Sequence, residues 1–161
     1  MKKLIFVRHS KAEEPVPEIS DFERSLTVKG KILSNVMALR LKEKVNSAGV
    51  ILTSPAFRAI ETALIFAGVF RIPSEEILIA GNIYYKFNLQ ALLQDLTMIK
   101  EDVELVTLFG HNPSFTELAG TLSKDGCDIM QKCAIVCISF KISTWSEIKR
   151  NTGIIEFYLK P

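Results

Sequence analysis

The sequence predicts an α/β domain with three layers, in which helices cover both faces of a mostly parallel central sheet. Two short apolar segments, residues 4–7 (LIFV) and 49–53 (GVILT), have the composition of buried parallel strands. Such segments alternate with longer ones of helical periodicity for most of the chain, which is typical of α/β folds. At 161 residues, with 48% hydrophobic and 24% charged residues, we expect one domain over 1–161 with its own core.

The first half of the chain is expected to alternate strands and helices. Residues 4–7 form the first strand, and the polar, proline-containing residues 10–25 form a long surface loop. Residues 27–45 form an amphipathic helix, residues 49–53 the second strand, and residues 54–70 the second helix. The periodicity of the first helix rests on two apolar rows, which are Val28, Ile32, Val36 and Leu33, Met37, Leu41, Val45.

The second half changes character toward its end. The remaining segments are expected in the order strand, helix, strand, helix, strand, strand, at residues 76–80, 88–100, 103–109, 113–122, 133–140 and 153–159. A polar stretch around Trp145 joins the last two strands. No linker, repeat or low-complexity tract divides the chain.

The composition excludes several classes of protein. A formal net charge of +2 provides no general attraction to nucleic acid or membranes, so any anion site must be local. The apolar run after the two N-terminal lysines is too short for a signal peptide or a membrane span. The three cysteines have no CxxC spacing, and we expect Cys133 and Cys137 to be core residues. These features predict a cytoplasmic protein.

Chemically informative residues lie just after the predicted strands. The first strand ends at Arg8 and His9. The second leads into Ser54 and Pro55, expected as the N-cap and first position of the next helix, which places Arg58 in its first turn. Ligands of open α/β sheets bind at the carboxyl ends of the strands, so these side chains are expected to meet.

The fourth strand adds a second histidine to the same edge. It is followed by Gly110, His111, Asn112 and Pro113, of which Asn112 is expected as N-cap and Pro113 as the first helical residue. A lone histidine at a strand end is more often structural, but here the only two histidines of the chain share one edge. Arginines and helix N-termini bind compact, multiply charged anions, so the sequence predicts a phosphate site.

These residues resemble signatures of the histidine phosphatase superfamily, the phosphoglycerate mutase-like fold, and especially its small SixA-type phosphohistidine phosphatases. The Arg-His-Gly signature is present as Arg8-His9-Ser10, and the Ser-Pro-x-x-Arg-x-x-x-Thr-Ala signature is intact at residues 54–63. An Arg-Pro-Leu-Thr-x-x-Gly stretch corresponds to residues 24–30, with serine in place of proline. The second histidine of the superfamily, after a strand and a glycine, corresponds to His111. The resemblance covers residues 4 to about 115, and these four motifs occur in the right order.

The resemblance implies a role for each matching residue. His9 would be the nucleophile and become transiently phosphorylated, while Arg8, Arg58 and His111 would hold the phosphoryl oxygens. Phosphoryl transfer depends mostly on positioning and electrostatic stabilisation, so no metal or other cofactor is expected. Further candidates for binding the substrate are Ser10, Arg24, Asn82 and Asn112.

One departure from the superfamily bears on the substrate. Many members place a glutamate after the third strand as general acid for an alcohol leaving group, and Asn82 lies near that position here. An amide does not donate a proton as a carboxylic acid does. Imidazole can leave from phosphohistidine already protonated, so the missing acid predicts a protein phosphohistidine substrate. An acid from Asp21 or Glu23 would overturn this prediction, although both are expected in a solvated loop.

The role of the aromatic residues near the site and the function of the chain both have alternatives that stay open. Tyr84, Tyr85 and Phe87 form either an apolar rim that docks a phosphohistidine protein of a signalling pathway or a set of packing aromatics. The chain could instead be a small-molecule phosphatase for a sugar phosphate or nucleotide. A third interpretation is a phospho-binding module without turnover, against which the retained His9 argues.

Overall fold

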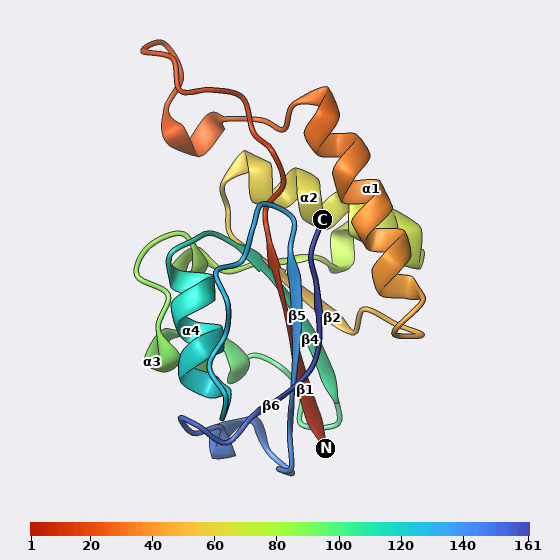
Figure 1. Cartoon of the computed structure of the whole chain (residues 1–161), viewed down its shortest axis with the longest axis vertical. Coiled ribbons are helices and arrows are strands. Elements are labelled where there is room, and N and C mark those ends of the chain that lie inside the picture. The colour runs from red at the N-terminus through yellow and green to blue at the C-terminus, as the bar shows by residue number, and fades with distance from the viewer.

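The computed structural model describes residues 1–161 and has the three layers predicted (Figure 1). A six-stranded sheet has the order β3-β2-β4-β1-β5-β6. The strands are β1 (Lys2–Arg8), β2 (Val50–Thr53), β3 (Leu78–Ile79), β4 (Leu105–Gly110), β5 (Ile135–Phe140) and β6 (Ile154–Leu159). The helices are α1 (Val28–Lys42), α2 (Phe57–Phe70), α3 (Leu89–Leu96) and α4 (Ser114–Leu122).

The sheet is mixed but mostly parallel, as predicted. β3, β2, β4 and β1 are parallel neighbours, whereas β5 is antiparallel to β1 and to β6. In the pairing of β1 with β4, Arg8 lies opposite Gly110. Because β1, β2 and β4 run in the same direction, the residues just after them lie at one edge of the sheet.

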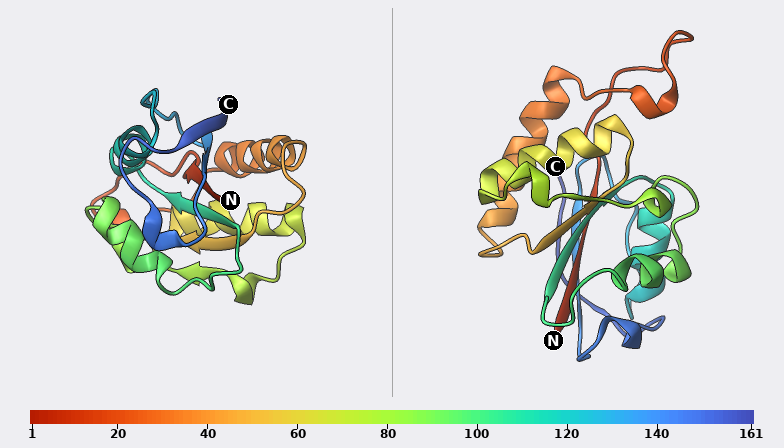
Figure 2. Two further views of the ribbon diagram at one scale, coloured as in Figure 1. Left: turned by 90° about the horizontal axis from the view of Figure 1, so that it is seen from below. Right: turned by 180° about the vertical axis from the view of Figure 1, so that it is seen from behind.

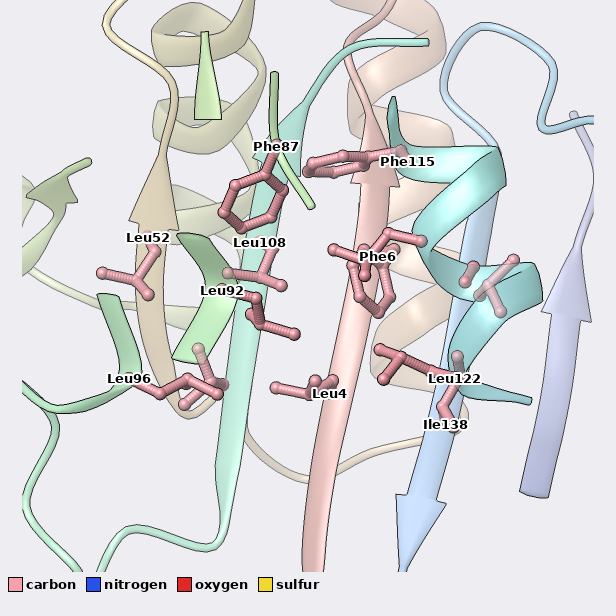
Figure 3. Packing of buried hydrophobic residues seen from close by; sticks show 14 of the residues in the cluster. Leu4, Phe6, Leu52, Phe87, Leu92, Leu96, Leu108, Phe115, Leu122 and Ile138 are labelled. Atoms are coloured by element: carbon pink, nitrogen blue, oxygen red, sulfur yellow. The ribbon is translucent and has the colours of Figure 1, made fainter. Parts of the chain in front are cut away.

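Two hydrophobic clusters occupy the two faces of the sheet. α1 and α2 cover one face, and α3 and α4 cover the other (Figure 2). Leu4 and Phe6 belong to the α3/α4 side, where Phe6 packs edge-on against Phe115 with ring centroids 5.3 Å apart (Figure 3). Ile5 and Val7 belong to the α1/α2 side. The LIFV segment has no polar alternation because both of its faces are buried.

The predicted elements exist, but several of their ends differ. The third strand is reduced to Leu78–Ile79, α1 ends at Lys42 rather than residue 45, and α3 ends at Leu96 rather than residue 100. Cys133 and Cys137 are buried in the same cluster, as predicted, and all three cysteines are free. None of the four helices is both long enough and apolar enough to cross a membrane.

One of the two apolar rows that predicted α1 is solvent-exposed. Val28, Ile32 and Val36 face outward, so this row is not part of the buried face of the helix. The buried face consists of Gly30, Ser34, Met37, Ala38 and Leu41. Small residues occupy the first two turns of this face because the chain after β1 passes close to the helix, and larger side chains would not fit there.

Gly30 marks this close approach, and its substitution should destabilise the protein. A Cβ atom at Gly30 would lie 2.1 Å from the main-chain oxygen of Lys11. We expect Gly30→Ala to lower the free energy of unfolding by about 1–3 kcal/mol, measured by urea denaturation. Gly68→Ala is the matched control, because no atom lies within 4 Å of its added Cβ, and it should raise stability by about 0.5–1 kcal/mol. Equal effects of the two substitutions would contradict the packing argument.

Candidate active site

The carboxyl edge of the sheet brings together the four predicted residues. Arg8 and His9 end β1, Arg58 lies in the first turn of α2, and His111 comes directly after β4. The His9 and His111 rings lie with their centroids 5.0 Å apart. The main-chain N–H of His9 donates to the Gly110 carbonyl at 2.9 Å, so the pairing of β1 with β4 places the two histidines side by side.

The hydrogen bonding of His9 leaves one ring nitrogen free. Its Nδ1 lies 2.7 Å from the Ser10 carbonyl oxygen, which can only accept, so Nδ1 carries the proton and Nε2 keeps its lone pair. Ser10 is itself held, because its N–H donates to Thr62 Oγ1 at 3.2 Å and its hydroxyl donates to the Gly30 carbonyl at 2.8 Å. The Ser10 hydroxyl is therefore engaged with the first turn of α1 rather than pointing toward a ligand.

Both histidines are neutral at physiological pH. Burial, then the nearby His111 and the Arg58 and Arg8 guanidinium groups, lower the pKa of His9 to about 3. Burial, then Arg58 and Arg8, lower the pKa of His111 to about 4. A neutral imidazole with a free nitrogen is a competent nucleophile, so His9 needs no separate base.

His111 is held by the residue that comes after β2. A hydrogen bond of 2.7 Å joins His111 Nε2 and Ser54 Oγ, and the Tyr84 ring packs edge-on against the imidazole at 5.7 Å. The prediction that Ser54 is the N-cap and Pro55 the first residue of α2 was wrong, because Ala56 is the N-cap. The Ser54 side chain is buried toward His111, which a local capping pattern does not reveal.

The arginines differ in their partners. Arg8 Nη1 donates to the Met130 carbonyl at 2.9 Å, while its buried Nε has no partner. Arg58 Nη2 donates to Asp21 Oδ2 at 2.9 Å, and its Nη1 donates to the Asp21 carbonyl. Arg24 Nη1 donates to the other Asp21 oxygen at 2.7 Å. The Asp21 carboxylate therefore bridges two arginines, one of them in the site.

Asp21 is exposed, as expected for a solvated loop, yet its carboxylate reaches Arg58, which the sequence did not predict. Partial burial raises the pKa of Asp21, but the hydrogen bonds and charges of Arg24 and Arg58 outweigh this and hold it below its usual value. A carboxyl group in this state is ionised at neutral pH. It therefore acts as a partner for Arg58 rather than as a proton donor.

The two candidate asparagines have different surroundings. Asn112 Nδ2 donates to the Met130 carbonyl at 2.9 Å, which also accepts from Arg8, so Asn112 lies beside the site. Its predicted role as N-cap was wrong, because Pro113 is the N-cap of α4. Asn82 Nδ2 donates to Asp95 Oδ1 at 2.7 Å, so its amide is engaged with α3.

Aromatic side chains line one side of the site. Phe22 packs against Tyr84 and Phe57, with ring centroids 5.3 and 6.1 Å apart, and Tyr84 packs against Tyr85 at 5.3 Å. Phe87, grouped with the tyrosines in the sequence, is buried in the core. Phe22 and Phe57 were missed because only the folding of the 10–25 loop brings them beside the tyrosines.

The donor set of the site suits an anion. Arg8 and Arg58 supply guanidinium donors, and the first turn of α2 contributes free N–H groups and the positive end of its dipole. No group of three or more His, Cys, Asp or Glu side chains is arranged to hold a metal ion.

The two histidines make a specific prediction for pH dependence. Their native pKa values lie below the unfolded value of about 6.5, so the unfolded state binds protons first as pH falls, and stability should decrease from pH 6.5 downward. At pH 5 the loss should be about 2 kcal/mol for each histidine, because both native pKa values lie well below 5. Because the chain has two histidines, NMR titration should show two imidazole signals that do not shift between pH 5.5 and 7.5. A midpoint near 6.5 for either would contradict the site geometry.

Solved structures with the same architecture identify the fold. The chain is similar to a protein from Nakamurella multipartitia assigned as the phosphohistidine phosphatase SixA, with a TM-score of 0.82, 16% identity, and 99% and 96% of the two chains covered. It is also similar to the protein histidine phosphatase SixA complexed with tungstate, with a TM-score of 0.81, 23% identity, and 99% and 97% coverage. The fold is that of the phosphoglycerate mutase-like histidine phosphatases.

The histidine phosphatase fold confirms, at the level of architecture, the resemblance seen in the sequence. A mycobacterial glucosyl-3-phosphoglycerate phosphatase shares it with a TM-score of 0.71, 12% identity, and 99% coverage of both chains. No protein-family model and no curated protein matches the chain. The same fold thus occurs in proteins named for a phosphohistidine substrate and in one named for a sugar phosphate.

Proposed function

We propose that this chain is a phosphatase that hydrolyses protein phosphohistidine through a covalent phosphoryl intermediate on His9, without a metal ion. The observation that carries the proposal is the state of His9. It is buried and neutral, its Nδ1 proton is held by the Ser10 carbonyl, its Nε2 is free, and Arg8, Arg58 and His111 are close enough to lower its pKa. The SixA protein with the same fold binds tungstate, a tetrahedral oxyanion like phosphate, which supports an oxyanion ligand for this chain.

The first step transfers the phosphoryl group between two imidazoles. His9 Nε2 attacks the phosphorus, and the P–N bond of the substrate breaks. The substrate histidine leaves neutral, because its other ring nitrogen already carries a proton. Phospho-His9 keeps its Nδ1 proton against the Ser10 carbonyl and is therefore cationic on the ring. No proton has to be delivered, so no general acid is needed.

The second step regenerates the enzyme. Water attacks phospho-His9, the P–N bond breaks, and His9 leaves as the neutral imidazole with its Nδ1 proton in place. Both protons of the water remain with the phosphate product. Arg8 and Arg58 stabilise the charge on the equatorial oxygens in both steps, and the low dielectric of the buried site strengthens these interactions.

The residues near the site favour P–N over P–O cleavage. An alcohol leaving group requires a proton, and general acids in enzymes have pKa values near the working pH. The Asp21 carboxylate is held ionised by Arg58 and Arg24, and the Asn82 amide is bound to Asp95. Neither can supply that proton at neutral pH.

A second candidate function is a phosphatase for a small phosphomonoester. One observation favours it, because the Tyr84 hydroxyl lies 3.4 Å from Asp21 Oδ2 and places a proton beside the carboxylate. The same fold occurs in a glucosyl-3-phosphoglycerate phosphatase. This candidate shares His9, Arg8, Arg58 and His111 with the first and differs in the leaving group.

The dependence of rate on the leaving group separates the two functions. Phosphate release should be measured in excess chelator from free phosphohistidine, p-nitrophenyl phosphate and glycerol 3-phosphate. Without a general acid, the alkyl phosphate should react at least about 10³-fold more slowly than phosphohistidine, while p-nitrophenyl phosphate should lie between them because its leaving group needs no proton.

Three outcomes would contradict the proposal. Comparable rates on glycerol 3-phosphate and phosphohistidine would establish a proton donor and favour the monoesterase. If Asp21→Asn then slowed only the alkyl phosphate, Asp21 would be that donor. Binding of phosphohistidine without release of phosphate would favour a phospho-binding module. Loss of turnover in chelator, restored by a divalent cation, would overturn the metal-free mechanism.

A further inference from the structure

The outer face of α1 carries an apolar row that nothing in the protein covers. Four side chains, which we call the α1 stripe, have exposed fractions of 75% (Val28), 61% (Ile32), 46% (Val36) and 49% (Leu39). Their spacing of four, four and three residues places them on one side of the helix. The buried residues of α1 lie on the opposite side. The stripe therefore points directly into solvent.

Such a row is unusual on a helix that already has a buried face. Met37 and Leu41 pack on the sheet, and α1 lies beside α2, so the core does not require the stripe. Single exposed apolar residues are normal, whereas a contiguous row indicates an interaction surface. β-Branched residues at three of the four positions also lower helix propensity without gaining burial, so helix formation does not explain them.

The stripe is bordered by positive charge on both sides. Between residues 28 and 45 there is one acidic residue, Glu43, against five basic residues, which are Lys29, Lys31, Arg40, Lys42 and Lys44. Only Lys31 forms an ion pair, with Glu61 at 3.4 Å. Arg40 and Lys42 donate to main-chain carbonyls, which leaves their charge uncompensated. A complementary surface would be acidic with an apolar strip.

The N-terminal end of α1, where the stripe begins, lies at the active-site end of the sheet. The Ser10 hydroxyl, next to the nucleophile, donates to the Gly30 carbonyl in the first turn of α1. Figure 1 shows α1 running from the site end of the sheet along the outside of the domain. A protein bound on the stripe would thus lie along the outside of α1 and extend toward the active-site end of the sheet.

We propose that the α1 stripe docks the protein that carries the phosphohistidine, through an acidic surface with an apolar strip. This inference rests on the proposed function. A second copy of this chain in a symmetric α1–α1 contact fits less well, because it would bring the lysines of the two helices together.

The test compares a docked substrate with one too small to dock. The variant Ile32→Glu/Val36→Glu replaces two apolar side chains of the stripe by acidic ones. The matched control is Ile79→Glu/Met98→Glu, because these side chains are also exposed, at 63% and 80%, but lie outside α1. The substrates are free phosphohistidine and an acidic histidine-phosphotransfer domain phosphorylated with phosphoramidate. We expect the stripe variant to lose at least about tenfold in kcat/KM on the protein, through KM, with unchanged activity on free phosphohistidine.

The outcomes separate this proposal from the proposed function. Activity on free phosphohistidine shows that each variant is folded. If the unmodified protein had no activity on free phosphohistidine, the proposed function itself would be overturned. Equal rates of both variants on the protein substrate would overturn the docking proposal alone. Stripe-dependent binding to vesicles of phosphatidylglycerol and phosphatidylcholine, or a stripe-dependent dimer in gel filtration, with no change on the protein substrate would replace the partner by a membrane or a second copy.

Discussion

His9→Ala is expected to reduce phosphate release from phosphohistidine by at least about 10³-fold, because it removes the atom on which the proposed mechanism forms the covalent intermediate. The unmodified protein, quenched in alkali during turnover, should carry label from 32P-phosphohistidine on His9, whereas the variant should carry none. Since Arg8, Arg58 and His111 remain, the variant should still bind inorganic phosphate in a calorimetric titration. This combination distinguishes loss of the nucleophile from loss of the fold.

The other histidine of the chain provides the control. His111→Asn removes a partner of Ser54 and a donor to the phosphoryl group, but leaves the Nε2 lone pair of His9 available. It should slow turnover by about 10²-fold and still accumulate label on His9. If labelling persisted in His9→Ala and was lost in His111→Asn, His111 rather than His9 would be the nucleophile. Rescue of His9→Ala by added imidazole would further support a nucleophilic role for His9.

Arg58→Lys is expected to lower kcat/KM for phosphohistidine by about 10²-fold, although the positive charge is kept. A guanidinium can bond two phosphoryl oxygens in one plane, whereas an ammonium is a point charge on a flexible stem. Arg58 is buried, and its backbone carbonyl accepts from Thr62 at 2.7 Å, so its position is defined by α2. Arg58→Ala should cost about 10³-fold, because it also removes the charge.

Arg24→Lys is the matched control, since Arg24 contacts the same carboxylate through its other oxygen but lies farther out on the loop. It should change kcat/KM by less than about fivefold. Steady-state rates on free phosphohistidine and the affinity for inorganic phosphate provide the two readouts. A large effect of Arg24→Lys together with a small effect of Arg58→Lys would contradict this prediction, because it would indicate that Arg24 rather than Arg58 binds the phosphoryl oxygens.

The positions of the four candidate site residues could be predicted from the sequence because the signals are local. Buried parallel strands appear as apolar runs, and the residues directly after such strands must lie at the carboxyl edge of the sheet. Arg8, His9, Arg58 and His111 were placed in this way, and the alternation of strands and helices was predicted from periodicity. These features depend on a few neighbouring residues, so periodicity and turn chemistry are enough to predict them.

Contacts between groups that are far apart in the sequence depend on how the loops and helices pack together. Asp21 reaches Arg58, and Ser54 binds His111, because the 10–25 loop and the β2–α2 turn pack against the sheet edge. The outward position of Val28, Ile32 and Val36 depends on which face of α1 the backbone after β1 approaches, and helical spacing is the same for either face. The pKa values of the histidines likewise depend on burial and on charges from other elements, which no local pattern encodes.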